Sequence, residues 1–584
     1  MRKTKIVCTI GPVTENEEMI TKLVNAGMNV ARLNFSHGDH EEHKRRIDLI
    51  KKVREKLNKP VAIMLDTKGP EVRLGRFTDG KTELCNGQCF TLTTRELMGD
   101  NTICSITYKD LPKEIRVGSR ILIADGLIEL KAVEKNECDV ICEVINGGPL
   151  SDKKNVNIPG ATSKLPAITE KDISDLIFGI ENEVDFIAAS FIRKASDVLE
   201  IRRILEENKG DFIQIISKIE NQEGVDNIEE ILKVSDGLMV ARGDLGVELP
   251  AEEIPLTQKK LIKLANDMGK PVITATQMLD SMIRNPRPTR AEVTDIANSI
   301  LDGTDAIMLS GETAAGKYPI ESITMMSTIA ERIEKSLDYN SIGTKLSDIG
   351  EITVANAVSH ASCTASMDLG AAAIITPTQS GSTPRMIAKF RPKAPIIAAV
   401  TEERIRRRLC LSFGVYGIVI PESENTDELI DLSVNEAISQ KYIKSGDLVV
   451  ITAGVPTGVA GTTNLIKVHI VGEVIARGMG VGTQSLSGRI CIIQDPAKDS
   501  DKLQSGDIMV IETTDKDTVP LMEKAAGFIV EEGGITSHAA VVALVLGKPV
   551  IVGVKYAASI LKDGQTVTMD TAHGLVYNGV TRVL

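Results

Sequence analysis

Apolar runs of strand length alternate with amphipathic stretches of helical period in the first part of the chain. KIVCTI at 5–10, NVARLNF at 29–35 and VAIMLD at 61–66 are separated by two such helical stretches, which predicts a βαβαβ start. The rhythm stops near residue 71 and resumes near residue 165 with DFIAASF, FIQIISKIE, GLMVARGDLG, PVITATQ and AIMLSGE. Three strands before the interruption and five after it make eight, which predicts a (β/α)8 barrel.

The segments outside this rhythm predict three further domains. Short β-like runs between Gly, Asn and Asp turns predict an inserted small β-barrel domain at residues 70–164, so that the barrel covers residues 1–69 and 165–345. A second αβ pattern predicts an open-sheet α/β regulatory domain at residues 346–472. The glycine-rich VIARGMGVG marks another boundary, and residues 473–584 predict an extra C-terminal α/β domain. The fold class is therefore α/β, with one all-β insert.

Composition excludes several classes of protein. The 584 residues are too many for one core, and the formal charge of −12 argues against a nucleic-acid partner. No signal peptide is visible, and no apolar run reaches the roughly 18 residues of a membrane helix, so we expect a cytoplasmic protein without a membrane partner. The nine cysteines lack zinc-site spacing and are expected to be reduced thiols.

Polar residues gather where the predicted strands end. Lys218 and Glu220 alone would be more typical of an exposed ion pair, which contributes little to stability. Because active sites of (β/α)8 barrels lie at the carboxyl ends of the strands, and polar groups recur at several of these ends, a shared site is the better interpretation. The strand-end residues are Arg32, Asn34, Asp66, Lys218, Glu220, Arg242, Gly243, Asp244, Thr276, Ser310 and Glu312.

The residue types indicate the chemistry of such a site. Glu220 and Asp244 offer two hard carboxylate ligands, so a magnesium ion would keep positions open for water and for a phosphate-bearing or oxyacid substrate. Lys218 stays protonated beside a carboxylate, which suits it to stabilising transition-state charge and not to forming a Schiff base. Backbone N–H groups from Gly243 onward could hold a carboxylate or phosphate. An all-oxygen set with one negative charge fits a monovalent cation, and its members are Asn34, Ser36, Asp66 and the Thr67 carbonyl.

Long motifs at these strand ends resemble one known family. RLNFSHG, LDTKGPEVR, SKIENQEG, ARGDLGVE, ATQMLDSM and MLSGETAAGKYP, in this order, are similar to pyruvate kinase, over about residues 1–470. The resemblance implies an allosterically regulated enzyme of glycolysis that transfers a phosphoryl group from phosphoenolpyruvate to ADP, giving pyruvate and ATP. It also implies a homotetramer that uses Mg²⁺ or Mn²⁺ and K⁺.

The resemblance further implies a role for individual residues. Arg32 would contact the phosphoryl group, and Lys218 would stabilise it in transit. Glu220 and Asp244 would hold the divalent ion, and Glu71 matches the potassium-dependent members. A water near Thr276 or Ser310 is the candidate proton donor to the enolate. The substrate carboxylate would lie on Gly243, Asp244 and Thr276, potassium on Asn34, Ser36, Asp66 and Thr67, and the nucleotide near Asn34, His37, Arg73 and Lys154.

Two motifs lie outside the barrel. TQSGSTPR follows a predicted strand, and its hydroxyls and helix N–H groups suit a phosphate, although an ordinary strand-to-helix turn fits equally well from composition. The resemblance favours an effector site for a sugar phosphate or nucleotide, formed by Thr378, Ser380, Gly381, Ser382 and Thr383.

The second motif is EEGGITSHAAVVALVLGKPVIVGV, which resembles the swivelling phosphohistidine domain of phosphoenolpyruvate-utilising enzymes and includes His538. No ATP-grasp-like domain accompanies it, so we expect a structural or regulatory role. Val541, Val542, Leu544 and Val545 are expected to form one buried face.

Two other functions remain open at this point. A magnesium-dependent lyase acting on pyruvate enolates would also use paired carboxylates and an arginine, but it has no need for an inserted lid or for Arg73 and Lys154. A phosphohistidine carrier or sensor would be built around His538 and TQSGSTPR. Turnover that depends on ADP separates the first alternative, and loss of turnover on changing Lys218 separates the second.

Overall fold

The structure is a computed structural model that describes residues 1–159, 166–339, 353–423, 425–454, 463–472 and 474–581. Three of the predicted domain boundaries fall at residues outside the described ones, namely 164 and 165, 345 and 346, and 473. The chain forms two compact units. The first contains Met1–Ile352, Ser380–Arg391 and Glu402–Gly417, and the second contains Thr353–Gln379, Pro392–Thr401 and Ile418–Leu584.

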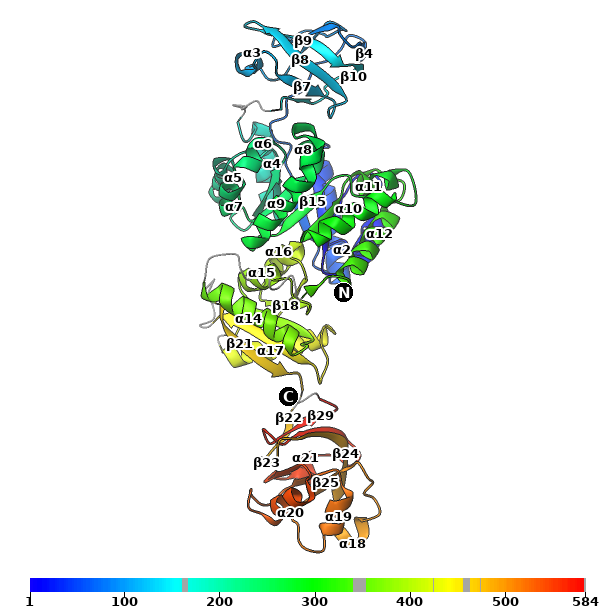
Figure 1. Cartoon of the computed structure of the whole chain (residues 1–584), viewed down its shortest axis with the longest axis vertical. Coiled ribbons are helices and arrows are strands. Elements are labelled where there is room, and N and C mark those ends of the chain that lie inside the picture. Colours follow the sequence, from blue (N-terminus) through cyan, green and yellow to red (C-terminus); the bar gives the residue numbers. More distant parts are fainter. Residues whose placement is uncertain (160–165, 340–352, 424, 455–462, 473, 582–584) are drawn as a thin grey trace. The chain divides into compact units, whose positions relative to one another are not determined.

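Eight parallel strands close a barrel in the first unit, which confirms the predicted (β/α)8 architecture (Figure 1). The order around the barrel is β1-β16-β15-β14-β13-β12-β3-β2. The bounds are β1 Lys5–Thr9, β2 Val30–Asn34, β3 Ala62–Asp66, β12 Phe186–Ala189, β13 Gln214–Ile219, β14 Gly237–Ala241, β15 Val272–Ala275 and β16 Ala306–Leu309.

Helices lie outside these strands, and polar residues fix where several of them begin. Thr169 and Thr289 each form a capping box, in which the threonine hydroxyl and an acidic side chain three residues later satisfy each other's backbone N–H groups. The helices around the barrel are α1 Glu17–Ala26, α2 His40–Leu57, α4 Glu170–Glu181, α5 Ala195–Glu207, α6 Gln222–Asp226, α7 Ile228–Val234, α8 Arg242–Glu248, α9 Ile254–Asp267, α10 Arg290–Leu301, α11 Gly311–Ala314 and α12 Pro319–Glu334.

Alternate strand residues face the barrel interior and the helices. Val7 packs inside while its neighbours Ile6 and Cys8 join the outer core, as the period of two along a strand requires. Cys410 and Leu411 belong to the same inner cluster as Val7. The Lys5 ammonium donates to the Val415 carbonyl at 2.5 Å, so residues 409–415 adjoin the end of the barrel where β1 begins.

The insert is an all-β structure with one short helix, α3 Leu111–Glu114. It has a two-stranded sheet, β10-β4, and a six-stranded sheet, β11-β7-β8-β9-β5-β6. Its strands are β4 Lys81–Leu84, β5 Cys89–Thr93, β6 Ile103–Ser105, β7 Arg120–Ile123, β8 Ile128–Lys135, β9 Asp139–Asn146, β10 Gly148–Ser151 and β11 Val156–Asn157.

The α/β pattern after the barrel forms a five-stranded sheet in the order β19-β18-β17-β20-β21, with β21 antiparallel to β20. Helices α15 and α16 follow strands β17 and β18 but belong to the compact unit of the barrel. The elements are α14 Val354–Asp368, β17 Ala373–Pro377, α15 Ser382–Lys389, β18 Ile396–Val400, α16 Glu403–Arg408, β19 Val415–Val419, α17 Thr426–Ser439, β20 Leu448–Gly454 and β21 Thr463–Ile470.

The C-terminal segment forms an eight-stranded sheet in the order β22-β29-β28-β24-β25-β26-β27-β23. Strands β24 to β27 pair in parallel, as expected for βαβ connections. The elements are β22 Val474–Arg477, β23 Met479–Val481, β24 Ser485–Ile493, α18 Pro496–Asp499, β25 Ile508–Ile511, α19 Val519–Lys524, β26 Gly527–Val530, α20 His538–Leu546, β27 Val550–Val552, α21 Ala557–Ile560, β28 Thr566–Asp570 and β29 Leu575–Asn578.

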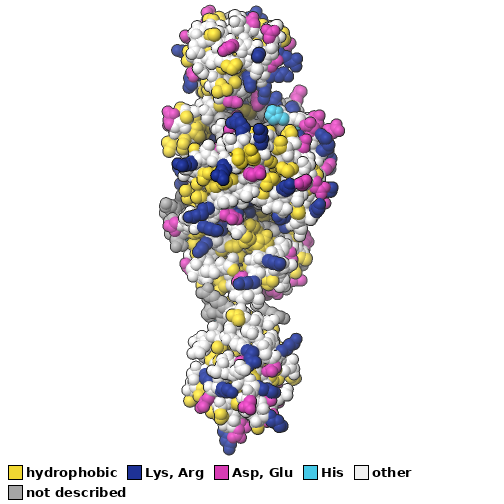
Figure 2. All heavy atoms as spheres, turned by 90° about the vertical axis from the view of Figure 1, so that its right-hand side faces the viewer, with side chains coloured by type: hydrophobic (Ala, Val, Ile, Leu, Met, Phe, Trp, Pro, Cys, Tyr) yellow, Lys and Arg dark blue, Asp and Glu magenta, His cyan; other side chains and the backbone are white. Residues whose placement is uncertain are grey.

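Charges of both signs lie side by side on the face shown in Figure 2. Within the described part of the chain, no helix combines the length and apolar character that a membrane crossing needs.

Candidate active site

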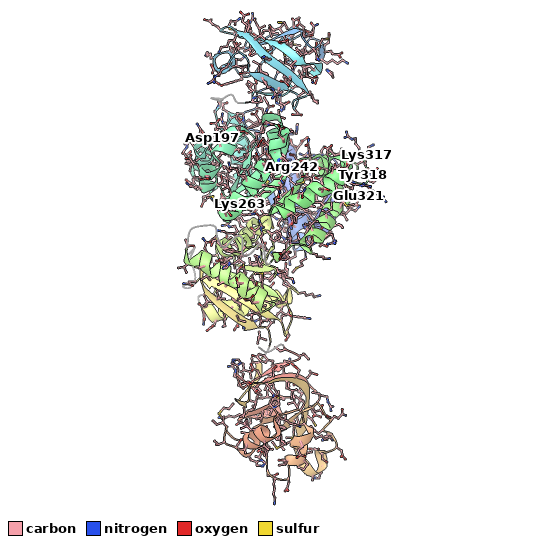
Figure 3. The ribbon with its side chains drawn as sticks, in the orientation of Figure 1. Asp197, Arg242, Lys263, Lys317, Tyr318 and Glu321 are labelled. Carbon is pink, nitrogen blue, oxygen red and sulfur yellow. The ribbon has the colours of Figure 1, made fainter. Side chains whose placement is uncertain are left out.

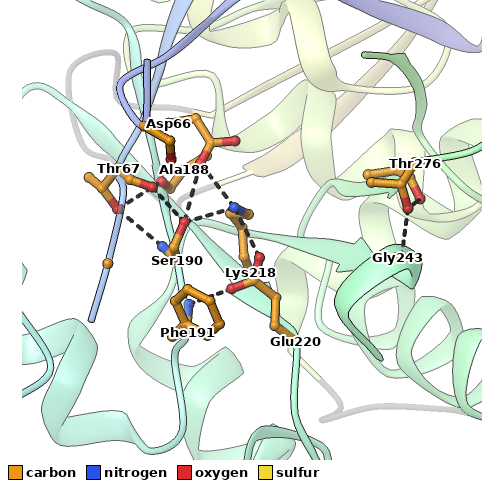
Figure 4. Close-up of polar contacts among 12 residues, drawn as sticks. Asp66, Thr67, Ala188, Ser190, Phe191, Lys218, Glu220, Gly243 and Thr276 are labelled. Carbon is orange, nitrogen blue, oxygen red and sulfur yellow. Dashed lines mark hydrogen bonds and ion pairs between the residues drawn. The ribbon is translucent and has the colours of Figure 1, made fainter. Parts of the chain in front are cut away.

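The ends of β3, β12 and β13 bring the central charged groups together (Figure 4). Lys218 Nζ lies 3.0 Å from Asp66 Oδ1, 3.0 Å from Glu220 Oε1 and 2.7 Å from the Ser190 hydroxyl. Arg32 Nε donates to Asp66 Oδ2 at 2.6 Å. Lys218 is 9% exposed and Glu220 2%, so their pair belongs to a buried cluster and the interpretation as an exposed surface pair is wrong.

Opposite charges keep this cluster ionised in spite of burial. Burial lowers the pKa of Lys218, but the carboxylates of Asp66 and Glu220 raise it, and the pKa ends above its ordinary value. Burial likewise opposes the charge of Asp66, but Arg32 and Lys218 hold its pKa below the usual range. Lys218 therefore stays an ammonium and cannot act as a Schiff-base nucleophile at neutral pH.

Buried Glu220 and half-buried Asp244 are the two carboxylates that could hold a divalent cation. Glu220 Oε2 accepts a hydrogen bond from Phe191 N at 2.6 Å, which fixes its orientation. Burial, and after it the nearby Glu220 charge, raise the pKa of Asp244 to about 7. A divalent cation would relieve this repulsion, so the pair fits Mg²⁺ or Mn²⁺. The described residues hold no group of three or more His, Cys, Asp or Glu side chains placed for a metal ion.

The oxygens predicted for a monovalent cation lie on neighbouring strands. Asn34 and Asp66 face each other in the β2–β3 register, and Asn34 Oδ1 accepts a hydrogen bond from Ser36 N at 3.1 Å. The Ser190 hydroxyl donates to the Thr67 carbonyl at 2.6 Å and lies 3.3 Å from Asp66 Oδ1. This set supplies carboxylate, carbonyl, amide and hydroxyl oxygens with one formal negative charge, which fits potassium better than a divalent ion.

Thr276 follows β15 in a strained conformation. Its φ of 69° is unusual for a β-branched residue, and its hydroxyl accepts a hydrogen bond from Gly243 N at 2.7 Å. Arg242 (Figure 3) donates to the carbonyls of Ala275 and Thr276 at 3.2 and 2.7 Å and pairs with Asp295 at 2.5 Å. Arg242 thus holds the strained turn and places the Thr276 hydroxyl beside Gly243.

A cavity of about 380 Å³ extends from the carboxyl ends of the barrel strands, here called the barrel mouth, to the insert. Glu220, Asp244 and Phe191 line it from the barrel, and Tyr108 and Asn155 line it from the insert. Its volume suits a ligand of moderate size, since small-molecule sites in proteins are typically about 300–1,000 Å³.

The predicted nucleotide residues are less closely gathered than the charged cluster. Arg73 Nε donates to Glu71 at 2.8 Å, and its Nη1 donates to the Lys153 carbonyl at 3.0 Å. Lys154 and His37 have exposed side chains.

Buried Glu312 accepts hydrogen bonds from the backbone N–H groups of Ser310 and Leu279, so its carboxylate fixes the backbone at the end of β16.

Sequence reasoning missed two residues of this site, Ser190 and Thr9. Ser190 follows β12 and links Lys218, Asp66 and the Thr67 carbonyl. Thr9 ends β1, and its hydroxyl accepts a hydrogen bond from Arg32 Nη1 at 2.9 Å. Both stand at the carboxyl end of a barrel strand, and that position is the sequence signal that points to them, although a lone hydroxyl there is a weak one.

The predicted effector loop, residues 378–383, leads into α15. The N-cap of α15 is Gly381 in the left-handed conformation, and no side chain caps the helix. The Ser380 hydroxyl donates to the Ser382 hydroxyl at 3.1 Å and accepts a hydrogen bond from Ser382 N at 3.3 Å. The loop is therefore not the turn with a side-chain N-cap that the ordinary interpretation requires.

His538 begins α20 in the C-terminal domain, where its exposed ring lies 3.0 Å from the Thr514 hydroxyl. The predicted buried face of this helix is wrong: Val541, Leu544 and Val545 are 52%, 64% and 81% exposed. The helix is apolar on every side, so periodicity could not tell which side is buried. Of the four predicted residues, only Val542 is partly buried and packs against the core, together with Leu546. The fully buried residues of the helix are Ala539, Ala540 and Ala543.

Known proteins resemble the chain along its whole length. Family models match residues 1–323 (pyruvate kinase, barrel domain), 356–469 (pyruvate kinase, alpha/beta domain) and 503–574 (PEP-utilising enzyme, mobile domain). The pyruvate kinases of Geobacillus stearothermophilus and Bacillus licheniformis are each 53% identical to it, over 100% of both chains. A crystal structure of a pyruvate kinase from Cryptosporidium parvum is 41% identical with a TM-score of 0.77, and the match covers 80% of this chain and 96% of that one. The chain therefore belongs to the pyruvate kinase family.

Proposed function

We propose that the barrel transfers the phosphoryl group of phosphoenolpyruvate to ADP and releases pyruvate and ATP. The observation that carries the proposal is the buried Lys218 ammonium, held charged between Asp66 and Glu220 at the barrel mouth. The names of the full-length relatives support the same reaction.

Arg32 and Lys218 would act on the phosphoryl group. The Arg32 guanidinium and the Lys218 ammonium each pair with the Asp66 carboxylate, which fixes their positions before substrate binds. Because phosphoryl transfer is catalysed mainly by positioning and by stabilising charge on the transferring group, two fixed cations at one mouth supply the main requirement.

Glu220 and Asp244 would hold Mg²⁺ or Mn²⁺, and Asn34, Ser36, Asp66 and Thr67 would hold K⁺. The divalent ion, when bound, would supply positive charge to substrate oxygens. The protein itself must hold the two carboxylates in position. Glu220 is held by its ion pair with Lys218 and by a hydrogen bond from the Phe191 N–H.

Gly243, Asp244 and Thr276 would seat the substrate carboxylate. The Gly243 N–H and the Thr276 hydroxyl lie at one turn that Arg242 holds in place. A water near Thr276 or Ser310 would protonate the enolate that remains after the phosphoryl group leaves.

The nucleotide phosphates would meet Arg73 and Lys154, with Asn34 and His37 nearby. Arg73 belongs to the insert and is held by Glu71, whose carboxylate lies 2.6 Å from its Nη2. The cavity that joins insert and barrel mouth supports a site where nucleotide and phosphoenolpyruvate meet.

A coupled assay of pyruvate formation tests the reaction. Phosphoenolpyruvate should be consumed only when ADP and Mg²⁺ are present, and K⁺ should increase the rate. Turnover of a pyruvate-enolate precursor without ADP would instead favour the lyase alternative, which the relatives' names do not support.

We further propose that the effector loop binds a phosphorylated effector and that the chain assembles as a homotetramer. The hydroxyl-rich loop at the start of α15 supports the first point. His538 and residues 473–584 are proposed to act in structure or regulation, because direct transfer in the barrel needs no phosphohistidine relay.

A further inference from the structure

Five basic side chains gather at the end of the barrel opposite the proposed active site. They come from α5, from the segment before β15, and from helices α15 and α16, all in the first compact unit. This basic cluster consists of Arg202, Lys270, Arg385, Arg404 and Arg408.

Two carboxylates, Asp185 and Asp236, act on this cluster, and both are already engaged. Asp185 Oδ1 pairs with Arg407 Nε at 2.8 Å. Asp236 Oδ2 accepts hydrogen bonds from Arg202 Nη2 at 2.5 Å and from Ile215 N at 2.9 Å. The Lys270 ammonium donates to backbone carbonyls near the end of α7, including that of Ser235 at 2.5 Å. These contacts account for Arg202 and Lys270 and leave the three arginines of α15 and α16.

Those three arginines form no ion pair with a carboxylate among the described residues. Arg408 Nη2 donates to the Phe212 carbonyl, but its Nε is buried without a hydrogen-bond partner. The Arg404 guanidinium lies 4.2 Å from the centroid of the Phe212 ring. Arg385 and Lys270 line a common small cavity.

The charges are close enough to influence one another. Burial lowers the pKa of Arg408, the positive charges of Arg404 and Arg385 lower it further, and Asp185 and Asp236 oppose them. Burial also lowers the pKa of Arg385, with Asp236 again opposing. A partly buried guanidinium group remains charged near neutral pH, so its positive charge is costly here unless an anion compensates it.

We propose that Arg385, Arg404 and Arg408 bind a phosphate group, either free phosphate or a phosphate monoester. Planar guanidinium groups bind phosphate oxygens through pairs of parallel hydrogen bonds, and the unpaired Arg408 Nε is a donor available for one. The bound anion would link α15 and α16 to the segment around Phe212.

This site is distinct from the proposed catalytic and effector sites. Phe212, Asp236 and Lys270 precede strands β13, β14 and β15, whereas the proposed catalytic residues stand at the carboxyl ends of the strands. The site also uses guanidinium groups, while the effector loop offers hydroxyls.

Calorimetric titration of the full chain with inorganic phosphate tests the proposal. The double variant Arg385→Gln/Arg404→Gln should bind phosphate at this site about tenfold or more weakly, since two charge-assisted hydrogen-bonding groups are lost. Arg203→Gln, on exposed α5 surface where Arg203 pairs with Glu207, is the matched control and should bind normally. Turnover of phosphoenolpyruvate with ADP, measured without added phosphate, should stay within about twofold in both variants, because neither touches the barrel mouth.

Alanine at the four hydroxyl residues of the effector loop should leave this phosphate binding intact. Unchanged affinity in the double variant, or loss of binding in the loop variant with retention in the double variant, would overturn the proposal. Crystals soaked in selenate give a test independent of the variants' folding: an anomalous peak should appear among the three arginines, and a structure with no such peak contradicts the site. Repeating the titration with glycerol phosphate identifies the source, because tighter binding of one ligand assigns the site to a monoester or to free phosphate.

Discussion

Replacing Lys218 with methionine removes a charge while keeping a side chain of similar length. The ammonium contacts Asp66, Glu220 and Ser190 within 3.0 Å, so it is held at the place where phosphoryl charge would develop. A unit charge about 4 Å away at an effective dielectric constant of about 20 contributes about 4 kcal/mol. That corresponds to about 10³ in rate, and water entering the site reduces the loss, so we expect kcat to fall roughly 10²–10³-fold with little change in the KM for phosphoenolpyruvate.

Folding must be followed in the same experiment. Removing one partner of a buried ion pair typically costs about 3–5 kcal/mol, although Arg32 remains on Asp66 in this variant. Lys5→Met is a matched control, because Lys5 is also a buried lysine but lies at the other end of the barrel. We expect its kcat to stay within a few-fold of the parent.

The assay is coupled pyruvate formation, with circular dichroism at the assay temperature to give the folded fraction. A Lys218→Met enzyme with near-parental kcat and only a raised KM would refute the role in transition-state stabilisation. An equal loss of kcat in the Lys5 control would attribute the effect to stability instead.

Other changes test the remaining assignments. Glu71→Lys should make activity less dependent on K⁺, because a fixed ammonium can replace a bound cation. Unchanged K⁺ dependence would contradict the assignment of Glu71 to potassium dependence. Alanine at the four hydroxyl residues of the effector loop should abolish activation by phosphorylated effectors and spare the maximal rate; retained activation places the effector elsewhere. His538→Ala should keep ATP formation within a few-fold of the parent. Two results together would contradict this: labelled phosphoenolpyruvate leaves a stoichiometric acid-labile label on His538 of the parent, and the variant loses turnover. Burial lowers the pKa of Lys5 to about 8 from an ordinary 10.5, so between these pH values the unfolded chain binds more protons and stability rises with pH. In urea titrations, the free energy of unfolding of the parent should therefore rise relative to that of Lys5→Met, by on the order of a few kcal/mol, as pH rises through this window. A difference that stays constant with pH would contradict a buried charge on Lys5.

Most of the fold could be predicted because its strands are buried on both faces. Each barrel strand is a short apolar run followed by a helix of clear period, and such runs can be counted without knowing their contacts. The strand-end rule then located Lys218, Glu220 and Asp66, whose charges are conspicuous next to apolar runs. Ser190 and Thr9 also stand at strand ends, but a single hydroxyl after an apolar run has no such contrast. Their importance appears only in the structure, where Lys218 and Arg32 on the neighbouring strands contact them.

The C-terminal helix α20 shows where sequence reasoning failed. Its large side chains were expected inside, yet Val545 is 81% exposed while Ala543 is buried. Hydrophobicity ranks Val above Ala, but close approach of a helix to a sheet favours the smaller residue, and a helix that is apolar on all sides has no periodic signal to choose between the two. The basic cluster also escaped prediction, because its members come from segments that lie far apart in the sequence.

The most direct test of the central claim is the stoichiometry of products from phosphoenolpyruvate and ADP with Mg²⁺ and K⁺ present. Pyruvate and ATP should appear in equal amounts and at equal rates, and both should be lost together in Lys218→Met. Pyruvate formed without ATP, or ATP formation that persists in Lys218→Met but disappears in His538→Ala, would contradict direct phosphoryl transfer at the barrel mouth.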